Sequence, residues 1–377
     1  MVAQRMGQAG YWTQASELLV QMLQKHESLQ DRAADPGHQS SERLRFMVDV
    51  QCMISTFLVD EAYASTFVSG DGNENRNLFL AGTLAKSAVE MVGDLRERHP
   101  EDSELVPTLA HALHAMGRAY GLVGQHVGLG VMSHRYAIKL PSCEQIFLEG
   151  KEALSASIRL ADQTGRLHLA ARARASLAEL MYCAASANTR GPRALMEPNQ
   201  DLVQGVESLT RTAIANSLHA LQMLKAAGEE ENARIIARVM KDIGKMYNFA
   251  SIFVFRLHDD SEQSRRWLQE ALELQTRLDG LTHKNTRNVR RLMGLEDADD
   301  MPEENDEHEA NDAQDSEPDI EPDPDELEAH ADTVMSAAEN ARVEEGGGAQ
   351  ALRAAGGILR RIPALVQAVL TGRILRR

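Results

Sequence analysis

Charged residues are segregated along this chain, and that segregation limits which part of it can fold. Between residues 296 and 345 there are 22 acidic residues and one basic residue, Arg342. From residue 346 to 377 there are six arginines and no acid, whereas residues 1–295 hold 33 basic and 34 acidic residues. A block of like charges repels itself and has too little apolar surface to offset the loss of chain entropy. We therefore expect a folded region over 1–295, an acidic disordered linker over 296–345 and a basic segment over 346–377.

The pattern of apolar residues in 1–295 is helical. Apolar residues recur at helical spacing between polar turn sequences. Ala, Leu, Gln, Glu and Met are common there and favour helix, while alternating β-branched residues are scarce. The sequence therefore predicts an all-α fold. Predicted helices cover 11–27, 42–69, 76–98, 103–123, 143–164, 167–187, 201–227, 230–256, 261–279 and 284–293.

Small residues occur at the middle of several predicted helices. Met116-Gly117-Arg118-Ala119-Tyr120 precedes a helix that contains Glu152-Ala153-Leu154. Ile243-Gly244-Lys245-Met246-Tyr247 precedes a helix that contains Ala271-Leu272. Gly and Ala allow two helix backbones to approach closely, and the large neighbour fills the groove beside them. We expect these helices to pack in pairs.

An apolar residue followed by Gly-x-x-Tyr, and then by an Ala-Leu helix, resembles the tetratricopeptide repeat. The segment from Glu270 to Asn288 is similar to the longer repeat of kinesin light chains, and the resemblance is best over 233–295. The Ala positions 88, 153, 220 and 271 are 65, 67 and 51 residues apart, instead of about 34. The resemblance thus implies an α-solenoid of antiparallel helical hairpins with long helices or inserted loops.

The same resemblance implies a peptide-binding groove. First helices of curved repeats line the concave side, and tetratricopeptide grooves clamp acidic or carboxylate-bearing peptides. Residues at steps of three and four share one face of a helix. The predicted peptide-binding residues are Arg234, Arg238, Lys241, Lys245 and Asn248. The alternative is a solvated basic stripe.

The sequence lacks the common catalytic and metal-binding motifs. It contains no phosphate-binding loop, no dinucleotide fingerprint and no nucleophile elbow. The segment from Asp71 begins like a calcium loop, but Arg76 stands where a sharp turn needs Gly, and Gly82 stands where Glu should bind. His111 and His114 are one turn apart without a third ligand, so we expect two half-exposed histidines and no metal.

The rest of the composition indicates no role in binding a cofactor, a small-molecule substrate or a nucleic acid. Cys52, Cys143 and Cys183 are widely spaced, which indicates buried thiols in a reducing compartment. Residues 1–295 have no basic excess, so we expect no nucleic acid. We expect no cofactor and no small-molecule substrate. No apolar stretch is long enough to span a bilayer, so we expect a cytoplasmic protein that is peripheral to membranes at most.

The basic segment contains an amphipathic pattern. At helical spacing, six apolar residues fall within an arc of about 120°, and arginines flank them. The predicted contact residues are Ile358, Leu359, Arg360, Arg361, Ile362, Leu365, Val366 and Val369. Residues 349–377 could lie on an anionic membrane, dock into a partner or fold back on residues 1–295. The remaining alternative is a segment that binds nothing and is amphipathic only by chance.

Together these features favour a non-enzymatic scaffold or adaptor. Its helical region would bind a partner protein or peptide, and its tail would attach to a membrane surface or a second partner. The alternative is an enzyme, or a regulatory subunit of one, whose site has no recognisable motif. A closed pocket with several perturbed acids or histidines would favour the enzyme, and an open groove would favour the adaptor.

Overall fold

The computed structural model describes residues 2–8, 12–30, 41–65, 73–190, 200–254, 258–281 and 283–295. These residues form helices and turns and contain no β-strand, which confirms the all-α prediction. The expected acidic linker and basic tail lie outside the described residues. The helices are α1 (Val2–Gln8), α2 (Trp12–Gln30), α3 (Ser41–Ser65), α4 (Asn73–Arg98), α5 (Leu105–Gly128), α6 (His134–Ala137), α7 (Cys143–Gln163), α8 (Leu167–Arg190), α10 (Gln200–Ala226), α11 (Ala233–Phe249), η1 (Ala250–Val254), α12 (His258–Asp279) and α13 (Lys284–Leu292).

The chain divides into two compact units. Residues 1–19 and 35–295 form the first unit, which contains every helix from α3 to α13. Residues 20–34 and 296–377 form the second, and only the C-terminal part of α2 is described there.

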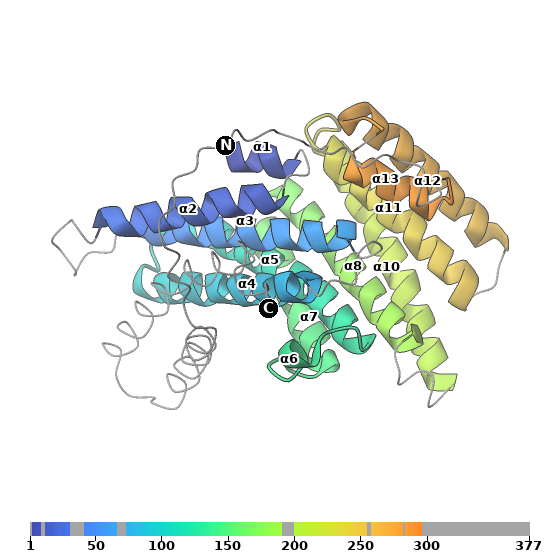
Figure 1. The fold of residues 1–377 in the computed structure, drawn as a ribbon, viewed down its shortest axis with the longest axis horizontal. Coiled ribbons are helices and arrows are strands. Elements are labelled where there is room, and N and C mark those ends of the chain that lie inside the picture. Colours follow the sequence, from blue (N-terminus) through green and yellow to red (C-terminus); the bar gives the residue numbers. More distant parts are fainter. Residues whose placement is uncertain are drawn as a thin grey trace, which may run out of the picture. The chain divides into compact units, whose positions relative to one another are not determined.

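Within the first unit, consecutive long helices pack as pairs: α3 with α4, α5 with α7, α8 with α10, and α11 with α12 (Figure 1). Contacts of α5 with α4 and α8 join neighbouring pairs, and α10 contacts α11. Short turns connect α7 to α8 and α10 to α11, so the chain reverses at each of them. The two pairs predicted from the sequence, α5 with α7 and α11 with α12, are confirmed.

Polar caps and glycines with positive φ set several helix ends. The Asp102 carboxylate accepts a hydrogen bond from the backbone N–H of Glu104 at 3.1 Å, just before α5. Ser142 caps α7 by accepting from the N–H of Gln145 at 3.2 Å. After α7, Gly165 has φ of 67°, and after α10, Gly228 has φ of 121°. Such left-handed residues end helices, and Gly adopts them without strain.

The predicted glycines lie where paired helices come closest. A Cβ added to Gly117 would lie 2.4 Å from Leu154 Cγ and 2.8 Å from the backbone oxygen of Gly150 on α7. A Cβ on Gly244 would lie 2.7 Å from Leu268 Cγ on α12. These distances are well below ordinary carbon contacts of about 3.5–4.0 Å. Both helix pairs therefore depend on glycine at their crossing.

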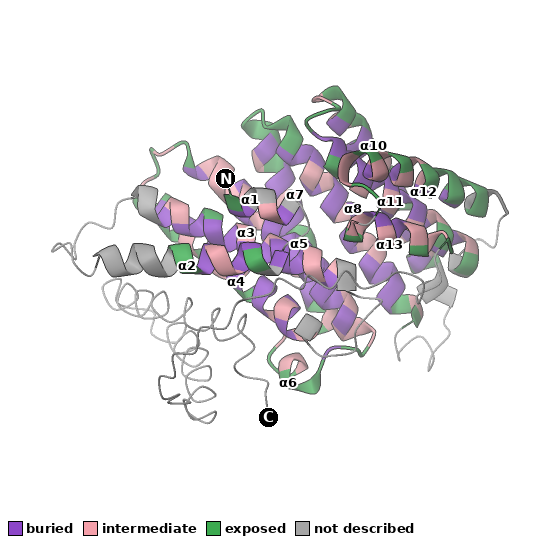
Figure 2. Ribbon diagram, turned by 45° about the horizontal axis from the view of Figure 1, so that its top comes forward, coloured by how far each residue is buried: buried purple, intermediate pink, exposed green. Residues whose placement is uncertain are grey.

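Buried faces of the helices meet between the pairs (Figure 2). Ala85, Ala88 and Ala115 are fully buried where α3, α4 and α5 pack together. A larger cluster around Ile236 and Ile243 joins α8, α10, α11, α12 and α13. Burying each such Ile contributes about 1.5–3 kcal/mol. The small alanines bring the helices close, and the branched side chains supply most of the hydrophobic stabilisation.

The structure corrects several predicted boundaries. Helix α5 continues to Gly128, where a loop was predicted from residue 124, because Gly124 and Gly128 pack against Phe147 and Ala187 rather than opening a turn. The short helix α6 lies within that predicted loop. Helix α11 ends at Phe249 and passes into the π-helix η1, and helix α1 was not predicted.

Candidate functional site

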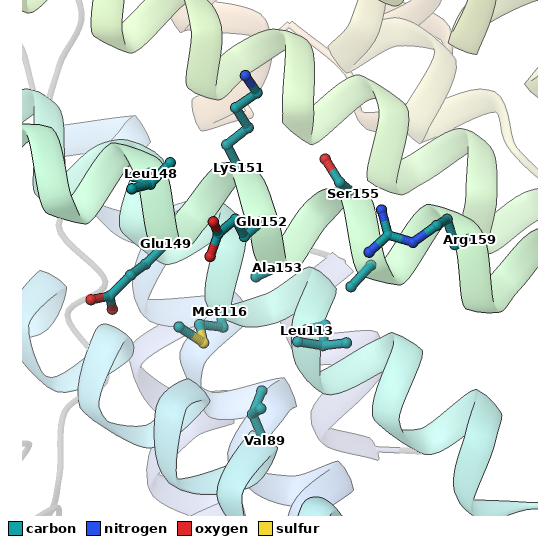
Figure 3. Close-up of a pocket in the computed structure, with 11 residues that line it drawn as sticks. Val89, Leu113, Met116, Leu148, Glu149, Lys151, Glu152, Ala153, Ser155 and Arg159 are labelled. Atoms are coloured by element: carbon teal, nitrogen blue, oxygen red, sulfur yellow. The ribbon is translucent and has the colours of Figure 1, made fainter.

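Helices α4, α5 and α7 form an open groove with a volume of about 660 Å³. Its floor is apolar: Val89 comes from α4, Leu113 and Met116 from α5, and Ala153 from α7 (Figure 3). Leu148 of α7 stands at its edge and is 49% exposed. Exposed leucines are ordinary on a surface when they stand alone, but this one adjoins an apolar concavity. The groove can therefore accept an apolar side chain or a row of them.

Charged side chains of α7 border this floor. Glu149 lies at one end and Arg159 at the other, with Glu152 between them (Figure 3). Ten residues of helix separate the two ends, which is about 15 Å. Lys151 points away from the floor (Figure 3). The groove thus has the length of roughly three helical turns and opposite charges at its ends.

A second feature is a group of charged side chains from α3, α5, α8 and α11, which we call the charge cluster. Its acidic members come from α3, α8 and α11, and its basic members come from α5, α8 and α11. They lie near enough to one another for each charge to act on several others. The charge cluster consists of Asp60, Glu179, Asp242, Arg118, Arg172, Arg238, Lys241 and Lys245.

The closest ion pair of the charge cluster joins α3 to α5. Nη2 of Arg118 donates to Oδ1 of Asp60 at 2.5 Å, and the Arg118 side chain is only 3% exposed. Burial alone would raise the pKa of Asp60, but Arg118, with Arg238 and Lys241, lowers it. Burial alone would lower the pKa of Arg118, but Asp60 and Glu179 raise it. Both groups are therefore charged near neutral pH.

Tyr63 and Lys245 connect this pair to α11. Two cations lie over the Tyr63 ring, with Arg118 Cζ 5.9 Å and Lys245 Nζ 5.5 Å from its centroid. Lys245 Nζ also lies 3.9 Å from Oδ1 of Asp242. Burial and the nearby Glu179 carboxylate raise the pKa of Tyr63 well above 10. The phenol is consequently neutral, and its ring faces add cation–π attraction for both basic side chains.

The other three cations of the charge cluster have no such partner. Among the described residues, no carboxylate lies within 4 Å of Arg172, Arg238 or Lys241. Burial, together with repulsion from Arg238 and Arg118, lowers the pKa of Arg172 to about 10. Burial also lowers the pKa of Lys241, although Asp242 acts in the opposite direction. Five basic groups therefore face three carboxylates, an excess of two positive charges.

His114 borders the charge cluster and corrects one prediction. The sequence predicted two half-exposed histidines, but His114 is only 3% exposed, and its Nε2 lies 3.0 Å from the hydroxyl of Ser176. Burial lowers its pKa well below 6.5, and Arg172 and His111 lower it further. His111 is partly exposed, with Nδ1 3.9 Å from Asp49. His114 is buried because its face of α5 packs against α8. The apolar pattern of α5 alone does not show which helix packs there.

The cysteines are free thiols. Cys52 and Cys183 are buried as predicted, whereas Cys143 is partly exposed and donates to the backbone oxygen of Gly124 at 3.3 Å. Burial raises the pKa of Cys52 and of Cys183. Thiols in this state are poor nucleophiles.

The residues predicted for peptide binding separate into three environments. Arg238, Lys241 and Lys245 belong to the charge cluster. Arg234 is partly exposed and pairs with Asp279 of α12 at 2.8 Å, and Asn248 is exposed near the end of α11. Their role in peptide binding stays a prediction, and the groove between α4, α5 and α7 does not include them. The predicted tail contacts from Ile358 to Val369 lie outside the described residues.

The sequence contained only part of the signal for these features. The basic stripe of α11 was visible because its members recur at three- and four-residue steps. Asp60, Arg118 and Arg172 lie on α3, α5 and α8, so no sequence spacing connects them to that stripe. An internal charge such as Arg118, one position after a crossing glycine, was the available signal, since a charged residue at a helix crossing must find a partner.

The described part of the chain contains neither a metal-binding cluster nor a membrane-spanning helix. No three His, Cys, Asp or Glu residues there are placed to hold a metal ion. No helix there combines the length and apolarity needed to cross a bilayer.

No known protein family matches the chain, and no curated protein matches it. Among solved structures it is similar to the de novo designed helical repeat protein DHR64, at 17% identity and a TM-score of 0.30, covering 65% of this chain and 99% of that one. It is also similar to the DHF119 filament, at 18% identity and a TM-score of 0.29, covering 62% and 99%. A circular tandem repeat protein with novel repeat topology and enhanced subunit contact surfaces is 13% identical, with a TM-score of 0.30, covering 100% and 76%. Similarities this weak do not assign the chain to a family.

Proposed function

We propose that this chain is a non-enzymatic scaffold or adaptor whose helical region binds a partner peptide. The observation that carries the proposal is the open groove between α4, α5 and α7, with its apolar floor and its charged ends. Helix-in-groove recognition uses such a surface: apolar residues of the peptide at i, i+3, i+4 and i+7 enter the floor, and polar residues contact the rim. The tetratricopeptide-like character of the hairpins belongs to this proposal.

The groove specifies the chemistry of its occupant. Leu113, Met116 and Val89 favour an apolar ridge about three turns long. Arg159 favours an acidic side chain at one end of that ridge, and Glu149 favours a basic one at the other. The proposed partner is therefore an amphipathic helix with opposite charges at its two ends.

A display selection of amphipathic helical peptides on the full chain tests this proposal. Selected peptides should lose binding to Leu148→Asp, because a charge at the groove edge disfavours an apolar ligand. Leu167→Asp is the matched control, since Leu167 is 58% exposed and lies outside the groove. Arg159→Glu should reverse the preferred charge at one end of the selected peptides. Peptides that bind Leu148→Asp and Arg159→Glu as well as the parent chain would refute the proposal.

An enzyme, or the regulatory subunit of one, is the second candidate. The perturbed pKa values of Arg172 and Lys241 in the charge cluster, and of His114 beside it, favour it, since such groups gather at reaction centres. The raised pKa of Cys183 disfavours a thiol nucleophile at the same place. The open form of the groove supports the adaptor over this candidate.

The basic tail supplies the proposed second attachment. Six arginines and an apolar stripe over 346–377 suit an anionic membrane surface or a second protein. On this proposal the chain holds its peptide partner near that surface, in the cytoplasm.

A further inference from the structure

The charge cluster contains more positive charge than its own carboxylates balance. Asp60 is engaged by Arg118 at 2.5 Å, and Asp242 lies 3.9 Å from Lys245. The third carboxylate, Glu179, is 7% exposed and lies beside the Tyr63 phenol. Arg172, Arg238 and Lys241 remain without an ion-pair partner within 4 Å in the described part of the chain. This arrangement leaves two uncompensated charges.

Burial makes that excess costly. Nε of Arg118 and Nε of Arg172 are both buried, and neither has a hydrogen-bond acceptor among the described residues. Buried guanidinium donors are usually satisfied in folded proteins, so the Nε of Arg172, which also lacks an ion pair, is a donor that a bound acceptor could satisfy. Surface lysines and arginines repel one another weakly through water, but partly buried ones repel more strongly. The fold therefore holds three like charges together without gaining stability from them.

The exposure of the unpaired cations leaves the cluster open to a small ligand. Arg172, Arg238 and Lys241 are each partly exposed, whereas the neighbouring Arg118 and His114 are nearly fully buried. Arginine forks bind the oxygens of a phosphate in pairs, and lysine adds a point charge. The excess of two charges matches a phosphate monoester, which carries between one and a half and two negative charges near pH 7. A carboxylate would leave one charge uncompensated.

We propose that Arg172, Arg238 and Lys241 form a binding site for a phosphate group carried by a small molecule. Because these three side chains are only partly exposed, a small ligand reaches them more readily than a phosphate on a macromolecule. This site shares no residue with the groove between α4, α5 and α7, so it can be tested separately from that groove.

Titration of the full chain with inorganic phosphate, and separately with glycerol phosphate, tests the site by calorimetry and thermal unfolding. Sodium chloride at equal ionic strength controls for screening. One phosphate should bind per chain and raise Tm, and chloride should not reproduce the rise. Arg172→Gln and Lys241→Gln should each weaken binding by about tenfold or more, because each removes a charge-assisted hydrogen bond. Arg96→Gln, on the exposed end of α4, should bind like the parent chain.

Stability without ligand separates this site from a structural role. If the three cations form an anion site that is empty in chloride, Arg172→Gln should have a Tm in chloride equal to or above that of the parent chain. The substitution removes one of three positive charges that repel one another. A marked fall in its Tm in chloride would overturn the proposal, because Arg172 would then be held by contacts of its own. Absence of saturable binding of both inorganic phosphate and glycerol phosphate, or an equal loss of binding in Arg96→Gln, would also overturn it.

Discussion

Replacing Gly117 by Ala should separate two helices that now touch. The new Cβ would lie 2.4 Å from Leu154 Cγ and 2.8 Å from the backbone oxygen of Gly150. Leu154 would have to retreat by about 1 Å to reach ordinary contact, yet it is fully buried. The Gly150 oxygen belongs to the backbone of α7, so it can move only if the helix moves. Overpacking of this kind costs about 1–3 kcal/mol.

An opposing effect comes from helix propensity, because Ala in a helix interior is about 0.5–1 kcal/mol better than Gly. Gly93 isolates that effect, since it lies in α4 and an added Cβ there would meet nothing within 4 Å. Gly93→Ala should therefore stabilise the chain by about 0.5–1 kcal/mol. Gly117→Ala should destabilise it, for the steric cost exceeds the propensity gain when the backbone itself is contacted.

Urea unfolding of the parent chain and both variants, followed by far-ultraviolet circular dichroism, measures the free energy of unfolding. The midpoint should fall for Gly117→Ala and rise for Gly93→Ala. A double variant with Leu154→Ala should show a favourable coupling with Gly117→Ala, because truncating Leu154 makes room for the new methyl group. If Gly117→Ala unfolds at the same midpoint as Gly93→Ala, the close crossing of α5 and α7 is refuted.

Three further changes test other parts of the structure. Asp60→Asn should lower the free energy of unfolding by about 3–5 kcal/mol, because it leaves buried Arg118 without its partner. In the same urea assay, Glu207→Gln, at the exposed pair with Arg211, should lower it by only about 0.3–0.5 kcal/mol. Equal costs would mean that Arg118 does not depend on Asp60. The folded-state pKa of His114 is lowered well below 6.5, so the stability that neutral His114 contributes is present above pH 6.5 and is lost as pH falls below it. His114→Gln should therefore reduce the pH dependence of the unfolding free energy between pH 7 and 5 by up to about 1.4 kcal/mol per pH unit. An unchanged slope would place the histidine in solvent. Replacing Arg360, Arg361 and Arg373 by Glu in the full chain should weaken binding to anionic vesicles by about a hundredfold or more, at about 1 kcal/mol per arginine. Co-sedimentation with the vesicles measures this binding, and an unchanged result would remove the membrane from the proposed attachments.

Sequence alone predicted the helices and two of their pairings because those depend on local patterns. Periodicity fixed the long helices from α2 to α13 within a few residues, and Gly117 and Gly244 indicated where pairs cross. The same reasoning failed at Gly124 and Gly128, since a glycine that admits a neighbouring helix and a glycine that opens a turn have the same sequence. Only the partner, here Phe147 or Ala187, distinguishes them.

The candidate sites were less predictable because their members come from separate helices. The stripe of Arg238, Lys241 and Lys245 could be recognised from its spacing. Its relation to Arg118 and Asp60 depends on how α3, α5, α8 and α11 pack, which no single-helix pattern contains. The groove was also invisible, because Met116 and Leu113 have the spacing of ordinary core residues.

Hydrogen exchange of the full chain with and without a peptide selected by display tests the proposed adaptor function most directly. Binding should slow exchange in α4, α5 and α7, around the groove, and leave the exposed helix ends of α10 and α12 unchanged. Protection confined to α11, with none in α5 or α7, would contradict the account.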